Sequence, residues 1–250
     1  MRTTRIYVDL EISAGQELLL PEAPASHLLR VLRLRLGSEL TLFNGRGGEY
    51  AATLVDTGKA GARVAVGAHD PVERESPLRL TLLQGVARGE RMDFIVQKAT
   101  ELGVQRIEPL SCEFSVVRLD VAGLQRRASH WRAVAIAACE QCGRNRLPQV
   151  EAVGDLAVAC ADGRDSGDGG DAGLRLMLLP QAPDSLASLA TGRRSVVLLV
   201  GPEGGLSGRE QLIAQRSGFQ ACRLGPRILR TETAPLAALA ALQALAGDLG

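Results

Sequence analysis

Short runs of strand-forming residues, separated by turn residues, follow one another through the first part of the chain. These runs cover residues 5–8, 39–43, 50–55 and 62–66. Turn residues at 44–45 and 47–48 divide them, as is typical of short strands joined by tight connections. The pattern predicts a small β-rich domain over residues 1–70.

A polar stretch bounded by prolines follows this domain. Pro71 and Pro77 enclose mainly charged residues, a composition typical of linkers between domains. We therefore predict a linker over residues 71–77. The chain of 250 residues is long enough for two hydrophobic cores, and we predict a second domain over residues 78–250.

The second domain alternates between strand and helix patterns. An apolar run at 78–86 precedes a helical spacing at 93–102, and another strand pattern covers 107–110. Strand, helix and strand in this order favour a parallel α/β sheet. Residues 195–200 are almost entirely apolar, as expected of a buried central strand.

The end of the chain repeats this alternation. Ser207 and Glu210 have the spacing of a capping box at the start of a helix that runs to Gly218. A further strand is predicted over residues 221–224, and an alanine-rich helix from about residue 234 ends the chain.

Composition and charge place few limits on function. The chain has 29 basic and 28 acidic residues, so its formal net charge is only +1, and a surface for nucleic acid would need local clustering of arginines. Five scattered cysteines do not form the dense framework of a small secreted domain. With no signal-peptide core and no apolar span of about 20 residues, we expect a cytoplasmic protein without membrane segments.

Two cysteines, Cys139 and Cys142, have the spacing of a metal-binding pair. No second pair or suitably spaced histidines accompany them, so a zinc site is not predicted. We expect no metal in the protein.

One helical stretch in the first domain carries candidate nucleic-acid contacts. Residues 26–33 have apolar side chains at helical spacing, which leaves Arg30 and Arg33 on an exposed side. Two interpretations are open, a solvated helix face and a patch that binds phosphate.

Residues 201–205, Gly-Pro-Glu-Gly-Gly, lie between a predicted buried strand and a capped helix. Open α/β sheets bind ligands at this position. The loop lacks the residues of a P-loop or of a dinucleotide-binding fingerprint, which disfavours an NTPase or a Rossmann dehydrogenase. Taken alone, however, the pentapeptide is better explained by a tight turn that needs glycine.

A second segment, residues 224–234, is unusually polar for a strand-to-helix connection. A turn glycine and an N-cap such as Thr231 or Thr233 would satisfy the backbone. That explanation does not account for the additional Arg227, Arg230 and Glu232.

Together these two segments resemble the cofactor loops of the SPOUT methyltransferases. Within that class the chain is similar to the RsmE family, which methylates N3 of a uridine in 16S (small-subunit) ribosomal RNA. The resemblance extends over nearly the whole chain and includes residues 89–93, 97–103 and 140–146, with 31–33 and 43–45 in the first domain. It departs from the family at Phe114, where an arginine is usual.

The resemblance implies a PUA-like β-barrel for RNA contact and a dimeric SPOUT α/β domain with a deep trefoil knot, although knots are nearly absent from other proteins. It also implies an S-adenosylmethionine site formed by Leu179, Pro180, Gly201, Pro202, Glu203, Gly204, Gly205, Leu224, Gly225, Ile228, Leu229 and Thr233.

Methylation of the uridine imide nitrogen requires loss of its proton or stabilisation of the resulting anion. The catalytic candidates are Arg230 and Glu232. For Glu232, a favourable carboxylate at a helix N-terminus is an equally good explanation. Candidate RNA contacts are Arg5, Arg30, Arg33, Arg35, Arg91, Arg144 and Asn145, and surface ion pairs are the alternative for Arg91 and Arg144.

Two other functions are compatible with the sequence. One is a non-catalytic RNA-binding factor in ribosome assembly, and the other is a SPOUT methyltransferase acting on transfer RNA. Binding of S-adenosylmethionine would separate the first from an enzyme, and the RNA that carries the modification would separate the second.

Overall fold

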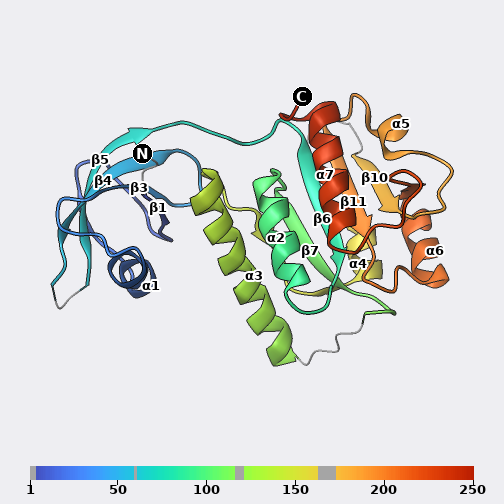
Figure 1. Cartoon of the computed structure of the whole chain (residues 1–250), viewed down its shortest axis with the longest axis horizontal. Coiled ribbons are helices and arrows are strands. Elements are labelled where there is room, and N and C mark those ends of the chain that lie inside the picture. The colour runs from blue at the N-terminus through green and yellow to red at the C-terminus, as the bar shows by residue number, and fades with distance from the viewer. Residues whose placement is uncertain (1–3, 59–60, 116–120, 163–172) are drawn as a thin grey trace. The chain divides into compact units, whose positions relative to one another are not determined.

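The computed structural model describes residues 4–58, 61–115, 121–162 and 173–250. These residues form two compact units (Figure 1). Unit 1 comprises residues 1–75 and 136–147, and unit 2 comprises residues 76–135 and 148–250. The first boundary lies inside the predicted linker, but the sequence did not indicate that residues 136–147 group with unit 1.

Unit 1 contains a five-stranded sheet with the order β1-β3-β4-β5-β2. Its strands are β1 (Thr4–Tyr7), β2 (Glu17–Leu19), β3 (Glu39–Phe43), β4 (Glu49–Asp56) and β5 (Arg63–Asp70). Alternate residues such as Leu40, Leu42 and Leu54 are buried in one core, as the period of two in a strand requires. The PUA-like β-rich prediction therefore agrees with this unit.

The helical segment of unit 1 begins and ends earlier than the predicted residues 26–33, and it is less regular than their apolar spacing suggested. Helix α1 (Glu22–Ser26) is followed by a single π-helical turn, η1 (His27–Val31). The chain then leaves the helix at Arg33, which has a positive φ of 54°. This exit leaves Arg30, Arg33 and Arg35 exposed on a short irregular segment.

Unit 2 contains a parallel sheet with the order β12-β10-β11-β6-β7-β8, and β9 also pairs with β7. The strands are β6 (Arg79–Gly85), β7 (Arg106–Ser111), β8 (Gln149–Val150), β9 (Gly154–Asp155), β10 (Leu174–Leu178), β11 (Ser195–Val200) and β12 (Gln220–Cys222). Every residue of β11 is buried, so the prediction of a central strand is confirmed.

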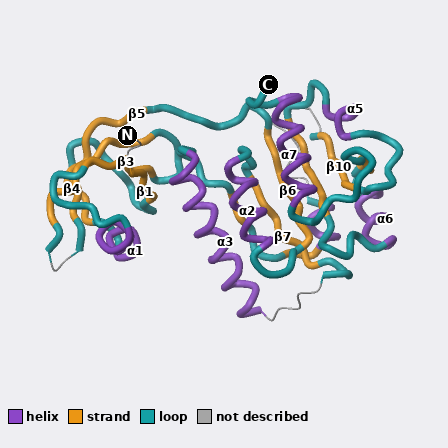
Figure 2. Tube along the Cα trace, viewed as in Figure 1, coloured by secondary structure: helices purple, strands orange, loops and turns teal. Residues whose placement is uncertain are grey.

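Helices cover both faces of this sheet (Figure 2). One core joins β6 and β11 to α2 (Arg91–Glu101), α5 (Leu186–Ala190), α7 (Thr233–Ala246) and the middle of α3 (Val121–Cys142). The other core joins the opposite face to α4 (Leu156–Ala161) and α6 (Gly208–Arg216). The α/β prediction is confirmed, whereas the knot stays a prediction.

Strand order determines where a site can form in unit 2. Strands β12, β10 and β11 are neighbours and run parallel, so their carboxyl ends lie at one edge of the sheet. The segments that follow β11 and β12 are the two that the sequence singled out. They therefore meet at the edge where open α/β sheets bind ligands.

Candidate functional site

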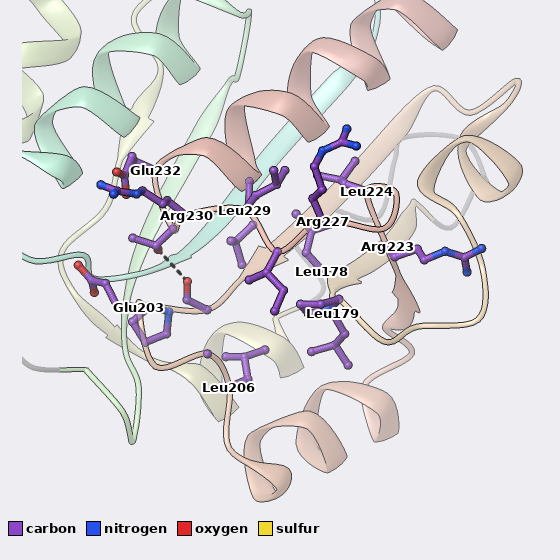
Figure 3. Close-up of a pocket in the computed structure, with 18 of the residues that line it drawn as sticks. Leu178, Leu179, Glu203, Leu206, Arg223, Leu224, Arg227, Leu229, Arg230 and Glu232 are labelled. Atoms are coloured by element: carbon purple, nitrogen blue, oxygen red, sulfur yellow. Dashed lines mark hydrogen bonds between the residues drawn. The ribbon is translucent and has the colours of Figure 1, made fainter.

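A cavity of about 520 Å³ lies at this edge of the sheet (Figure 3). Its volume is within the range of roughly 300–1,000 Å³ that is typical of small-molecule sites. The lining comes from the ends of β10, β11 and β12, the segments after them, and the start of α2 and α7. These residues are Arg91, Leu178, Leu179, Pro180, Val200, Gly201, Pro202, Glu203, Gly205, Leu206, Cys222, Arg223, Leu224, Gly225, Arg227, Ile228, Leu229, Arg230, Thr231, Glu232 and Ala234.

The cavity has a largely apolar side. Leucine side chains from three different segments surround it in Figure 3, among them Leu179, Leu206 and Leu229. Such a lining favours a ligand with a substantial apolar surface, whose orientation a few polar groups of the site would fix. The thiol of Cys222, at the end of β12, is fully buried, and burial raises its pKa to about 12.

Residues 201–205 form a compact turn in which glycine is needed for close backbone approach. The amide of Gly205 donates to the carbonyl of Pro202 at 2.9 Å, and Gly205 has a φ of 73°. A Cβ on Gly201 would lie 2.9 Å from the carbonyl carbon of Gly205 and 3.0 Å from the amide nitrogen of Leu206. Alanine therefore does not fit this turn without a backbone shift.

The turn is fixed at both ends. At its far end the Ser207–Glu210 capping box is present, which confirms the sequence prediction. At its near end the carbonyl of Gly201 accepts a hydrogen bond of 3.0 Å from Oγ1 of Thr231 (Figure 3). This bond ties residues 201–205 to the segment that leads into α7.

Charged groups line the opposite side of the cavity. Nη1 of Arg91 lies 2.7 Å from Oε1 of Glu203, and its Nε lies 3.7 Å from Oε2 of Glu232. Partial burial alone would raise the pKa of Glu203. Hydrogen bonds from the amide of Arg88, its own amide and the Arg91 side chain outweigh burial and lower that pKa. Glu203 is therefore an ionised carboxylate beside the cavity.

Comparisons with known proteins agree with this geometry. A family model described as RNA methyltransferase domain matches residues 74–243, and one described as RNA methyltransferase PUA domain matches residues 20–66. The chain is 30% identical to ribosomal RNA small subunit methyltransferase E of Buchnera aphidicola, over 99% of this chain and 98% of that protein. The chain belongs to the ribosomal RNA small subunit methyltransferase E family.

Solved structures of similar sequence cover the whole chain. The RsmE protein of Neisseria gonorrhoeae, bound to S-adenosyl methionine, is 38% identical with a TM-score of 0.88 over 100% of both chains. A protein of Legionella pneumophila in complex with the cofactor SAM is also 38% identical, with a TM-score of 0.93 over 100% of both chains.

Most of the residues predicted for the cofactor of this RsmE-family protein line the cavity. Gly204 and Thr233 do not. A Cβ on Gly204 would lie 2.7 Å from Cβ of Phe114, so this glycine leaves room for a neighbouring loop. Thr233 is exposed on the first turn of α7. Sequence reasoning missed Thr231 as a site residue, although it had noted Thr231 as a possible helix cap.

The cavity also has arginines on its outer side, and these differ in their contacts. Arg223 donates to the carbonyl oxygens of Ala182 and Pro183, and Figure 3 shows its side chain directed away from the leucines. Arg227 and Arg230 are exposed. Sequence reasoning assigned a role to Arg230 only.

Two predicted RNA contacts of unit 1 are buried in its interior. Arg144 is 4% exposed and forms a two-bond ion pair with Glu75, with Nε 2.9 Å from Oε1. Asn145 is 0% exposed and donates to the carbonyl of Val72 at 2.8 Å. Because loss of one member of a buried pair strongly destabilises a fold, this placement supports a structural role for both residues.

Arg5 has a similar environment. It pairs with Glu49, donates to the side chain of Asn145, and lies 4.9 Å from the centre of the Phe43 ring. Of the arginines predicted for RNA in unit 1, Arg30, Arg33 and Arg35 are therefore the exposed ones.

The described residues were also compared with the requirements of a metal site and of a membrane-spanning helix. In the described part of the chain, no three His, Cys, Asp or Glu side chains gather in a way that could hold a metal ion. Within the same ranges, no helix is long and apolar enough to cross a membrane.

Proposed function

We propose that this RsmE-family protein uses S-adenosylmethionine to methylate N3 of a uridine in 16S ribosomal RNA, in the cytoplasm and as a homodimer of its SPOUT domain. The observation that carries the proposal is the cavity after β10, β11 and β12. It combines an apolar side with paired charges, and both 38% identical structures were solved with that cofactor.

The residues of the cavity fit this cofactor. Leu179, Leu224 and Leu229 provide apolar surface for an adenine ring, and the backbone of residues 201–205 and 224–229 provides amides and carbonyls for its edge. S-adenosylmethionine, when bound, supplies a methyl group on a sulfonium, so transfer depends chiefly on positioning donor and acceptor.

Removal of the N3 proton is assigned to Glu232, and stabilisation of the base anion to Arg230. Glu232 makes no side-chain hydrogen bond to the start of α7, although it occupies the N-cap position. Its carboxylate is held by Arg91 at the cavity instead. Arg230 is exposed beside it, where a guanidinium can donate to the carbonyl oxygens of a uridine that has left its stack.

Nucleoside analysis of RNA from cells with and without the protein tests which RNA is the substrate. We expect 3-methyluridine to disappear from 16S ribosomal RNA in cells that lack the protein and to return when it is restored. Transfer RNA from the same cells is the control and should keep its modifications. A change confined to transfer RNA would replace the proposed substrate, and absence of S-adenosylmethionine binding in calorimetry would favour the assembly factor.

The exposed arginines of unit 1 are proposed to bind RNA phosphates. Replacing Arg30, Arg33 and Arg35 by methionine should weaken RNA binding and make it less dependent on salt. Each lost phosphate contact is expected to reduce the slope of log K against log salt by about 0.7 to 0.9, so the triple variant should lose roughly 2 to 3.

Filter-binding titrations over a range of salt concentrations measure this slope. Arg63→Met is the matched control, because Arg63 lies on β5 of the same unit and pairs only distantly with Glu17, at 3.9 Å. An unchanged slope in the triple variant would assign these arginines to a solvated surface.

A further inference from the structure

Arg91 is the one basic side chain predicted for RNA contact that lines the cavity of unit 2. It is the first residue of α2, directly after the segment that leaves β6. Its side chain is 42% exposed, so exposure alone is compatible with an RNA contact, a surface ion pair or a role inside the site.

The contacts of Arg91 distinguish these roles. Its guanidinium uses two different nitrogens for two carboxylates, Nη1 for Glu203 at 2.7 Å and Nε for Glu232 at 3.7 Å. The two carboxylates belong to the two segments that form the cavity, one after β11 and the other before α7. A planar fork with donors on separate edges can hold both at once.

Neighbouring bonds hold the same elements together. The amide of Arg88 donates to Oε1 of Glu203 at 2.9 Å, so the segment before α2 binds this carboxylate through its backbone as well. On the inner side, Thr231 donates to the carbonyl of Gly201. Arg91 and Thr231 therefore connect the same two segments, the one after β11 and the one before α7. Arg91 connects them through side chains, and Thr231 through a bond to the backbone.

We propose that Arg91 is a positioning residue, which holds Glu203 and Glu232 in place and thereby fixes the two cofactor segments for methyl transfer, and that it does not bind RNA. The inference rests on the proposed cofactor site. Arg91 together with Glu203 and Glu232 has a formal charge of −1, and such a cluster attracts a phosphate only weakly. Partly exposed ion pairs add little stability, so loss of Arg91 should affect positioning and leave the fold intact.

The test compares Arg91→Met with Arg91→Lys in the full chain. For Arg91→Met we expect the single-turnover rate of methyl transfer to fall by roughly 10- to 100-fold, because a displacement of about 1 Å near the reacting groups costs about this much. The melting temperature and the dissociation constant for RNA should stay unchanged. Lysine keeps the charge and should recover part of the rate.

A double-mutant cycle that combines Arg91→Met with Glu203→Gln measures whether the two residues act together on the rate. If each residue acted separately, the two rate losses would multiply. If Arg91 acts through Glu203, the double variant should be little slower than Arg91→Met alone. Arg216→Met is the matched control, because Arg216 is an exposed arginine in the last turn of α6 and should show the wild-type rate.

Three results would overturn the inference. They are an unchanged rate in Arg91→Met, fully additive effects in the cycle, and RNA binding that weakens with a salt slope smaller by about 0.7 to 0.9. Failure of the proposed function is distinct from these, because the wild-type protein would then not bind S-adenosylmethionine in calorimetry.

Discussion

Replacing Gly201 by alanine should remove most of the affinity of the protein for S-adenosylmethionine. The new Cβ would lie about 3 Å from backbone atoms of Gly205 and Leu206, and backbone atoms cannot rotate away as a flexible side chain can. Opening the turn by the required amount costs roughly 1–3 kcal/mol, as for other overpacked sites. If that cost falls on the binding-competent turn, the dissociation constant should rise about 5- to 150-fold.

Isothermal titration calorimetry with S-adenosylmethionine measures this effect. Gly208→Ala is the matched control, because no atom lies within 4 Å of a Cβ at that position and its φ is not positive. Gly208 begins α6, where alanine is a better helix former than glycine. Wild-type affinity in Gly201→Ala would show that the cofactor does not depend on the observed shape of the turn.

The sequence was sufficient to predict those parts of the fold that depend on local patterns. The apolar run of β11, the Ser207–Glu210 capping box and the start of α7 follow from residue type and spacing within a few positions. The short elements β8, β9, α4 and α5 have too few residues to show a period. The sequence therefore did not predict them.

The site was predicted by resemblance at the level of segments and less well at single residues. Thr233 and Thr231 are both suitable helix caps in the same segment, but only Thr231 reaches the carbonyl of Gly201. No property of residues 224–234 alone distinguishes the two, because the difference depends on how the chain passes residues 201–205.

Charged side chains were the least predictable feature. An arginine is normally exposed, and Arg144 therefore suggested a surface contact. Its partner, Glu75, lies 69 residues away in sequence, and no local pattern indicates that this pair is buried. No local pattern indicates the ion pairs of Arg91 either, because its two carboxylates come from segments more than 100 residues further along the chain.

Replacing Glu232 by glutamine should cause the largest loss of activity among these variants while cofactor binding persists. Glutamine keeps the size of the side chain but cannot accept the N3 proton of uridine. Loss of a positioned general base typically costs about 10²- to 10⁴-fold in rate, so the single-turnover rate of Glu232→Gln should fall by this amount. The dissociation constant for S-adenosylmethionine should change little.

The pH dependence of this loss separates a base from a residue that only shapes the site. As the pH rises, a growing fraction of the uridine loses its N3 proton to solvent and no longer needs a base. The deficit of Glu232→Gln relative to wild type should therefore shrink with increasing pH. Glu90→Gln is the matched control, because Glu90 is an exposed carboxylate directly before α2 and makes no capping hydrogen bond. A deficit that is constant with pH would contradict proton removal by Glu232 and would assign its carboxylate to holding Arg91 and the cofactor segments.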